Sequence, residues 1–239
     1  MFRKEIINKI QKMIPHNLYI ELKKLNTMIA GGAITSLYTG KKINDFDLYF
    51  KNEDDAIKAE KLLKENGYSL MSKTNNALTF ENHNILEGMN PLMFQIIIGK
   101  NLFFDNPKDL IASFDFTINM AAFDLKAGEL IIGDKFEEDN LKRKLIYNNK
   151  SKYPIVSLQR AIKYINRGYS LSPVEQVNIA LHINSLLINN LMDLKIQLQG
   201  IDTAVFSPII KDLIDNNNEE YDYDTFKEKL DKKDDNNEY

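Results

Sequence analysis

The chain has 239 residues, of which 44% are hydrophobic and 27% charged, a composition typical of one or two globular domains. It contains no cysteine, which excludes disulfide scaffolds, thiolate zinc sites and cysteine nucleophiles, and its three histidines leave little room for histidine-based metal sites. No apolar run approaches the roughly 18 residues that a membrane span requires, and the first residues lack the apolar core of a signal peptide. We therefore expect a cytoplasmic protein with no membrane partner.

The net charge of −3 is unevenly distributed. Residues 215–239 contain ten acidic and four basic residues, a net charge of −6, so residues 1–214 carry +3. Segments that are rich in charge and poor in apolar residues cannot bury enough surface to fold alone. We predict a disordered, solvated acidic tail, with competition for a basic groove against nucleic acid as the alternative.

Hydrophobic periodicity predicts a first half that mixes helices and strands. In chain order we expect helices at 3–13 and 17–25, a strand at 27–30, a helix at 33–38, a strand at 45–50 and a helix at 53–66. Strands at 68–72, 77–81 and 92–98 follow, then a short helix at 107–113 and a hairpin of 117–124 with 129–132. After residue 150 only helices are predicted, at 155–167, 173–188, 190–199 and 207–215. The sequence thus predicts an α+β domain over residues 1–150, a small helical domain over 151–214 and the tail.

A glycine pair followed by an aspartate pair carries the chemistry of the first half. Gly31 and Gly32 join a buried strand to a helix, where bare backbone and unpaired N–H groups favour binding of a triphosphate. Asp45 and Asp47 lie two residues apart on the next strand and so project from one face. Neighbouring carboxylates repel unless a cation lies between them, and Mg²⁺ prefers oxygen ligands. The pattern predicts an anion site and a two-metal site beside one cleft.

The stretch from Gly31 to Leu48 resembles the first motif of the CCA-adding tRNA nucleotidyltransferases and bacterial poly(A) polymerases, in the DNA polymerase beta superfamily. Residues 115–124, Asp-Phe-Thr-Ile-Asn-Met-Ala-Ala-Phe-Asp, resemble a second motif of that family, and residues 158–168 are similar to its phosphate-binding helix. The resemblance covers about residues 25–170. It implies a nucleotidyltransferase-type mixed sheet flanked by helices and followed by a small helical domain.

The resemblance also implies roles for individual residues. Gly31 and Gly32 would cradle the triphosphate, and Asp45 and Asp47 would be catalytic ligands of two Mg²⁺ ions. Four further nucleotide contacts are implied: Asp115 and Asn119 on the ribose, and Arg160 and Lys163 on the phosphates. The implied reaction is template-independent transfer of a nucleoside monophosphate from an NTP to a hydroxyl, with an RNA 3′ end such as that of tRNA as the acceptor.

Three departures from the family pattern keep alternatives open. Thr35-Ser36 and Ser113-Phe114 stand where the family has Arg-Asp and Arg-Arg, and Gln95 stands at the apparent position of a third metal-binding carboxylate. A glutamine oxygen can bind a metal but cannot accept the proton of an attacking hydroxyl as a carboxylate can. Glu81 or Glu87 is an alternative third acid. The rival hypothesis is a catalytically impaired module that binds nucleotide, nucleic acid or protein, and small-molecule or protein hydroxyls remain alternative acceptors.

Overall fold

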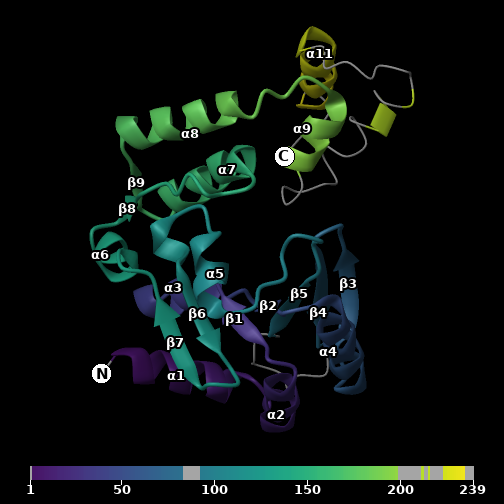
Figure 1. Cartoon of the computed structure of the whole chain (residues 1–239), viewed down its shortest axis with the longest axis vertical. Coiled ribbons are helices and arrows are strands. Elements are labelled where there is room, and N and C mark those ends of the chain that lie inside the picture. The colour runs from purple at the N-terminus through teal and green to yellow at the C-terminus, as the bar shows by residue number, and fades with distance from the viewer. Residues whose placement is uncertain (1, 83–91, 199–210, 213–214, 216–222, 235–239) are drawn as a thin grey trace.

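The structure is a computed structural model, which describes residues 2–82, 92–198, 211–212, 215 and 223–234. Its centre is a mixed seven-stranded sheet in the order β3-β4-β5-β2-β1-β6-β7 (Figure 1). Of its neighbouring strands, only β2 and β5 run parallel. The strands are β1 Met28–Ala30, β2 Asp45–Tyr49, β3 Ser69–Lys73, β4 Ala77–Glu81, β5 Met93–Ile97, β6 Ala121–Asp124 and β7 Glu129–Ile132.

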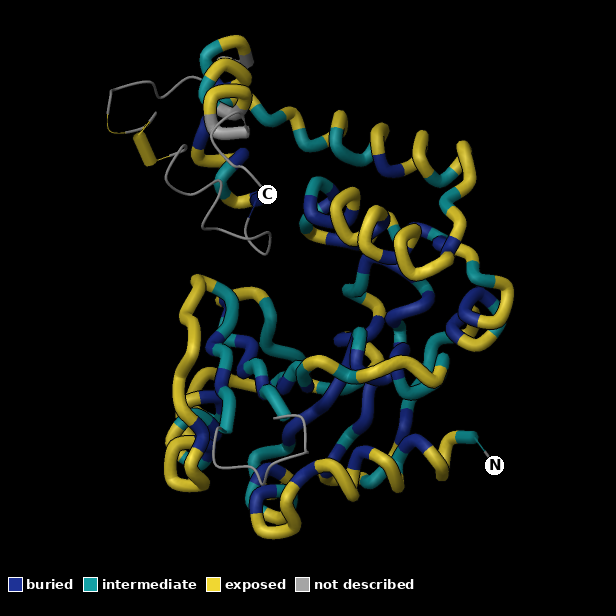
Figure 2. The backbone as a smooth tube through the Cα atoms, turned by 180° about the vertical axis from the view of Figure 1, so that it is seen from behind, coloured by how far each residue is buried: buried dark blue, intermediate teal, exposed yellow. Residues whose placement is uncertain are grey.

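Four helices cover one face of this sheet, where the main hydrophobic core lies. They are α1 Phe2–Met13, α2 His16–Lys24, α3 Gly32–Thr39 and α4 Glu53–Glu65. Apolar residues of these helices, such as Ile10 and Leu22, pack against fully buried strand residues such as Phe46 and Phe94. Figure 2 shows the resulting contrast between buried strands and helices that are exposed along their outer sides.

The opposite face of the sheet is only partly covered. Helix α5 (Pro107–Ala112) places Leu110 and Ile111 on Ala30 of β1 and Ala122 of β6. The strands β2, β5, β4 and β3 continue beyond this contact and carry polar side chains on the same face. Asp47 pairs with Gln95, and Gln95 in turn pairs with Thr79. This polar part of the sheet is the floor of the site described below.

The remaining elements are mainly helical: η1 Thr117–Asn119, α6 Phe136–Leu141, α7 Pro154–Ile165, α8 Pro173–Ser185, α9 Leu191–Gln197 and α11 Tyr223–Asp234, with the short paired strands β8 Lys144–Leu145 and β9 Ser170–Leu171. Helix α7 is anchored to the sheet half because Ala161 and Tyr164 pack against Phe116 and Ile118, which flank and form η1. Helix α8 packs on α7 through Ile179 and leaves most of its surface exposed (Figure 2).

The predicted α+β class with a mixed sheet flanked by helices is confirmed, and most predicted elements agree with the structure within two residues. The strand predicted at 117–124 is wrong in its first half, because backbone bonds from Asn119 to Phe116 and from Met120 to Thr117 form the 3₁₀ turn η1. Helix α6 and the strands β8 and β9 were not predicted. Most of the helix predicted at 207–215 lies outside the described residues.

The acidic segment also differs from the expectation where the structure describes it. Tyr223–Asp234 form helix α11, in which Lys227 pairs with Asp231 and Lys232 with Glu228, one helical turn apart. Phe226 is buried against a small cluster with Val156 and residues of α9. The two ion pairs and the burial of Phe226 stabilise helix α11. The average composition of the segment does not indicate these contacts. Across the described residues, no helix has the length and apolarity needed to cross a membrane.

Candidate functional site

The glycine pair forms a sharp turn between β1 and α3. Gly31 adopts φ 79° and ψ −137°, a backbone conformation that favours glycine, and its N–H donates to the carbonyl of Ala121. A Cβ at Gly31 would lie 3.6 Å from Oδ2 of Asp47, whereas a Cβ at Gly32 would meet no atom within 4 Å. The turn therefore brings Asp47 close to the backbone at the start of α3, whose first N–H groups have no intrahelical partner.

The aspartate pair projects from β2 toward the open face of the sheet. Along this strand Asp45, Asp47 and Tyr49 are half-buried, while the alternate residues Phe46 and Leu48 are fully buried in the core. The period of two in the sequence therefore places both carboxylates on the same side. Gln95 lies beside Asp47 on the parallel strand β5.

The two carboxylates carry unfavourable charge in the absence of a cation. Burial, followed by the negative charge of Asp45, raises the pKa of Asp47 to about 7, against the opposing effect of Arg160 and Lys163. Burial also raises the pKa of Asp45, and Lys163 is the main group that opposes it. A cation between the two carboxylates would offset their mutual repulsion and favour the ionised form of both, so the pair is suited to bind one.

The oxygen donors here fit a hard divalent ion. Asp45 and Asp47 supply carboxylates, and Gln95 supplies an amide whose Nε2 donates to Thr79 Oγ1 at 3.3 Å. No described residue donates to Oε1 of Gln95, which leaves this oxygen as a third candidate ligand. Within the described part of the chain, no group of three or more His, Cys, Asp or Glu residues could hold a metal. Glu81 lines neither of the two cavities that Gln95 lines, and Glu87 lies outside the described residues.

A buried carboxylate and an amide lie across the cavity from this pair. Asp115 is only 2% exposed; its Oδ2 accepts from Arg160 Nη1 at 3.1 Å, while its Oδ1 has no partner among the described residues. Asn119 Oδ1 accepts from the Tyr164 hydroxyl at 2.7 Å, and the Thr35 hydroxyl lies 3.2 Å from the same atom. These donors fix the amide of Asn119, so that its Nδ2 is left to donate to a ligand.

Helix α7 supplies the positive charges of the site. Its residues Arg160 and Lys163 lie three apart and so share a face. The charge of Asp115 is the main cause of a raised Arg160 pKa, and half of the Arg160 side chain is exposed to the cavity and solvent. Arginine has five N–H donors, so one bond to Asp115 leaves others for a ligand.

All nine residues selected from the sequence line one cavity of about 480 Å³. They are Gly31, Gly32, Asp45, Asp47, Gln95, Asp115, Asn119, Arg160 and Lys163. The cavity is also lined by residues that sequence reasoning missed: Tyr49, Phe114, Val156, Gln159 and Tyr164. Tyr49 follows Asp47 by two strand positions and Tyr164 follows Arg160 by four helix positions, so periodicity contained a signal for both. Nothing in the sequence selects Gln159.

A family model described as Gabija anti-defense 2 family protein matches residues 1–143. The chain belongs to the Gabija anti-defense 2 family. It is 34% identical over 206 residues to the protein named Gabija anti-defense 2 from Bacillus phage SPbetaL7, covering 86% of this chain and 49% of that protein. The chain thus spans about half the length of this curated relative. The family differs from the tRNA-maturing one that the sequence motifs suggested.

Two solved structures show that this chain shares the fold that its motifs resemble. One is a CCA-adding enzyme in apo form I, with a TM-score of 0.53, 16% identity, and coverage of 87% of this chain and 53% of that one. The other is the Thermotoga maritima CCA-adding enzyme complexed with tRNA, with a TM-score of 0.50, 17% identity, and coverage of 86% and 54%. The resemblance is confirmed at the level of a nucleotidyltransferase-like fold.

Proposed function

We propose that this chain is a template-independent nucleotidyltransferase that moves a nucleoside monophosphate from an NTP to a hydroxyl and releases pyrophosphate. The observation that carries the proposal is the convergence of three unlike groups on one cavity: the glycine turn, two carboxylates with raised pKa values, and two cations of α7. A glycine turn at a helix start binds polyphosphate, and paired carboxylates bind a divalent ion. Cations on one helix face neutralise the charge of the phosphates.

Each residue then has a defined task. The N–H groups that follow Gly31 donate to the phosphate oxygens, and Lys163 neutralises the charge of those oxygens. Asp115 Oδ1, buried and without a partner among the described residues, accepts from a ribose hydroxyl, and Asn119 Nδ2 donates to a neighbouring ribose oxygen. Together these contacts hold the α-phosphate over the carboxylates.

The residues that would hold Mg²⁺ are Asp45, Asp47 and the amide oxygen of Gln95. Two such ions would activate the attacking hydroxyl and stabilise the charge of the departing pyrophosphate. The carboxylates bind the cations more tightly once both are ionised, so we expect affinity for Mg²⁺ to rise through pH 7.

The sequence motifs favour an RNA 3′ end as the acceptor, with small-molecule and protein hydroxyls as alternatives. The phage relative is named for an anti-defense role, and we propose that this chain serves the same purpose by nucleotidyl transfer. The direct test is incubation with labelled NTPs, Mg²⁺ and RNA, with self-labelling of the protein scored in parallel. Asp45→Ala should abolish incorporation, whereas Asp54→Ala on the exposed start of α4 should not. Incorporation that survives Asp45→Ala would refute the proposal.

One observation favours a second candidate, a module that binds Mg²⁺ and nucleotide without turnover. Gln95 occupies the strand position beside Asp47, and its amide cannot take a proton from an attacking hydroxyl. This candidate predicts Mg²⁺-dependent heat of NTP binding in calorimetry, together with no product from any acceptor.

A further inference from the structure

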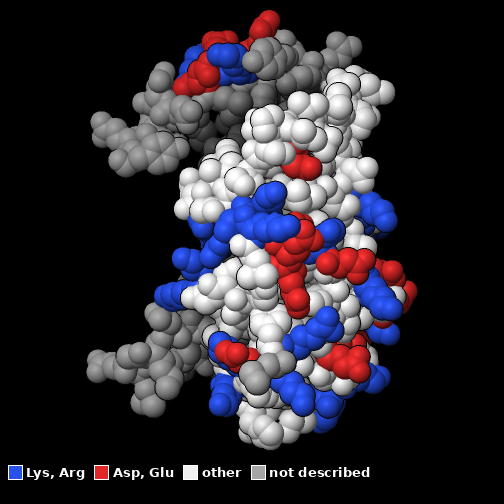
Figure 3. All heavy atoms as spheres, turned by 90° about the vertical axis from the view of Figure 1, so that its left-hand side faces the viewer, with Lys and Arg blue, Asp and Glu red and all other residues white. Residues whose placement is uncertain are grey.

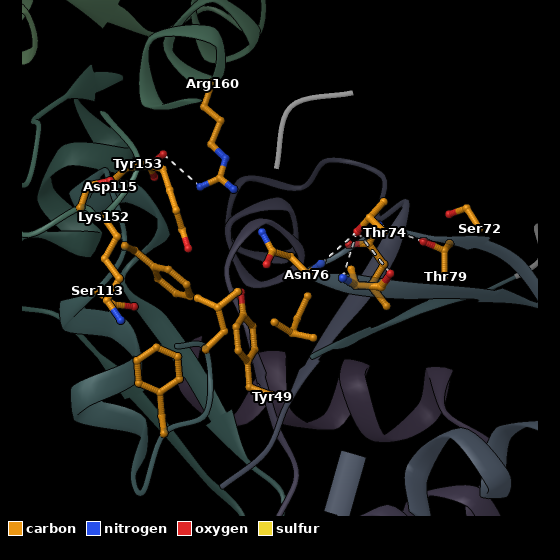
Figure 4. Close-up of a pocket in the computed structure, with 17 residues that line it drawn as sticks. Tyr49, Ser72, Thr74, Asn76, Thr79, Ser113, Asp115, Lys152, Tyr153 and Arg160 are labelled. Atoms are coloured by element: carbon orange, nitrogen blue, oxygen red, sulfur yellow. Dashed lines mark hydrogen bonds and ion pairs between the residues drawn. The ribbon is translucent and has the colours of Figure 1, made fainter. Parts of the chain in front are cut away.

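A second cavity, also of about 480 Å³ and drawn in Figure 4, adjoins the first along the residues that the two share, among them Gln95. In Figure 4, Arg160 and Tyr153 lie on one side of it, Asn76 and Thr74 on the other, and Tyr49 below. Five residues line both cavities: Tyr49, Gln95, Phe114, Asp115 and Arg160. The two spaces are therefore adjacent compartments, and Gln95 is the proposed metal ligand that lines both.

The floor of the second cavity follows a single row of the sheet. Asp47 pairs with Gln95, Gln95 with Thr79, and Thr79 with Ser72, so these four side chains lie on one face across four neighbouring strands. Strands lie about 4.8 Å apart, so Ser72 is roughly 14 Å from Asp47. The cavity extends from Gln95, beside Asp47, to Ser72 on the exposed edge strand β3, about 10 Å across two strand spacings, a length that accommodates one nucleoside.

The in-line geometry of nucleotidyl transfer indicates which substrate binds in this compartment. In an in-line displacement the attacking and leaving oxygens lie on opposite sides of the phosphorus. The proposed function places the leaving pyrophosphate on the side of the glycine turn and Lys163. The attacking hydroxyl must then approach from the side of Gln95, which opens into the second cavity.

The lining specifies a ligand with an aromatic ring, several polar groups and little charge. It includes the rings of Tyr49, Phe104, Phe114 and Tyr153, the hydroxyls of Ser72, Thr74, Thr79, Ser113 and Ser151, and the amides of Asn76 and Gln95. Aromatic rings stack on bases, while hydroxyls and amides bond to base edges and sugars. Two cations and one acid line the cavity, and the acid Asp115 is paired with Arg160. Lys152, whose Nζ bonds to the carbonyl of Asn101, is the remaining charge.

We propose that this compartment binds the acceptor, and that the acceptor is a small molecule, a free nucleoside or nucleoside monophosphate, in place of the RNA 3′ end that the sequence motifs favour. A single phosphate matches Lys152, the cation of the lining that has no acidic partner among the described residues, whereas each further nucleotide of an RNA chain would add a charge that the lining does not neutralise. This proposal rests on the proposed function. The acceptor hydroxyl oxygen bonds to the α-phosphorus of the NTP, the bond from that phosphorus to the pyrophosphate oxygen breaks, and the hydroxyl proton passes to water. The products are a dinucleotide and pyrophosphate.

The test is calorimetric binding of each of the four nucleoside monophosphates, and of adenosine, to protein already saturated with Mg²⁺ and a non-hydrolysable NTP analogue. Ser72→Trp fills the outer end of the cavity, and Ser69→Trp is the matched control, since it is also exposed on β3 but lines neither cavity. Lys152→Ala removes the phosphate partner, and Lys150→Ala, exposed nearby, is its control.

We expect at least one monophosphate to bind the wild type and both control variants equally. Its affinity should fall at least tenfold in Ser72→Trp. It should fall about tenfold in Lys152→Ala, because this substitution removes one charge-assisted contact to the phosphate. Adenosine binding should be unaffected by Lys152→Ala. The inference is overturned if the NTP analogue binds but no monophosphate or nucleoside does, if Ser72→Trp leaves their affinity unchanged, or if only oligoribonucleotides bind. Failure of the NTP analogue itself to bind would instead refute the proposed function.

Discussion

Asp47→Asn should stabilise this protein in the absence of Mg²⁺ while removing its metal affinity. The pKa of Asp47 rises from 3.8 to about 7 on folding, so the folded state holds this proton more tightly than the unfolded state does. As the pH rises from about 4 to 7, the ionising carboxylate increasingly destabilises the fold, and above pH 7 the penalty is complete. Asparagine keeps the shape of the side chain but cannot ionise.

The expected magnitude follows from the size of this shift. A change of about three pKa units corresponds to roughly 4 kcal/mol at most, since each unit is about 1.4 kcal/mol. Asp47 keeps some contact with solvent, so we take about half of this, near 2 kcal/mol, as the expected gain. For a chain of this size the melting temperature should rise by roughly 4–8 °C at pH 8.

Thermal unfolding at pH 8 and pH 4, with and without Mg²⁺, provides the assay. At pH 4 the gain should nearly vanish, because the folded wild type is protonated there. Mg²⁺ should stabilise the wild type and not the variant, because only the wild type binds it. Asp54→Asn, an exposed carboxylate on α4, controls for the loss of one charge. The reasoning is refuted if Asp47→Asn melts no higher than the wild type at pH 8, or gains equally at both pH values.

Three further substitutions test individual contacts. Tyr164→Phe removes the 2.7 Å hydrogen bond to Asn119, and its loss should lower the free energy of unfolding by about 1 kcal/mol. The KM for NTP should rise several-fold while kcat stays nearly unchanged. An equal fall in kcat would contradict a positioning role for Tyr164. Gln95→Glu supplies a third carboxylate and should tighten Mg²⁺ binding about tenfold in a titration, and unchanged affinity would place Gln95 outside the metal site. Gly31→Ala places a side chain at φ 79°, which costs roughly 1–2 kcal/mol in backbone strain, and should abolish NTP binding. Gly40→Ala is the control: it lies at φ 67° with open space around it, so it should cause similar strain and leave NTP binding intact.

The local geometry of the site was predictable because it follows from short-range patterns. The alternation from Asp45 to Tyr49 sets which side chains face the core, and the structure retains that alternation. The glycine pair indicates a turn into a helix by composition alone, and Gly31 has the backbone angles that explain it. These features depend on neighbours in the sequence and hardly on the rest of the fold.

The contacts between distant segments were not predictable from one sequence. Arg160 and Asp115 are 45 residues apart, and so are Tyr164 and Asn119. Their contacts require α7 to pack over η1, which depends on buried residues such as Phe116 and Ala161 from separate elements. The second cavity arises from the strand order, which sets Thr79 and Ser72 beside Gln95. Periodicity specifies the face of a strand but not its neighbours.

The central claim is that one cavity holds NTP through Mg²⁺ bound by the β2 carboxylates. Calorimetry of NTP binding to the wild type, to the Asp45→Asn/Asp47→Asn double variant and to Asp54→Asn, each with Mg²⁺ and with a chelator, tests it most directly. We expect the wild type and Asp54→Asn to bind NTP only when Mg²⁺ is present, and the double variant not to bind it. Equal binding by all three proteins, or binding that persists in the chelator, would contradict it.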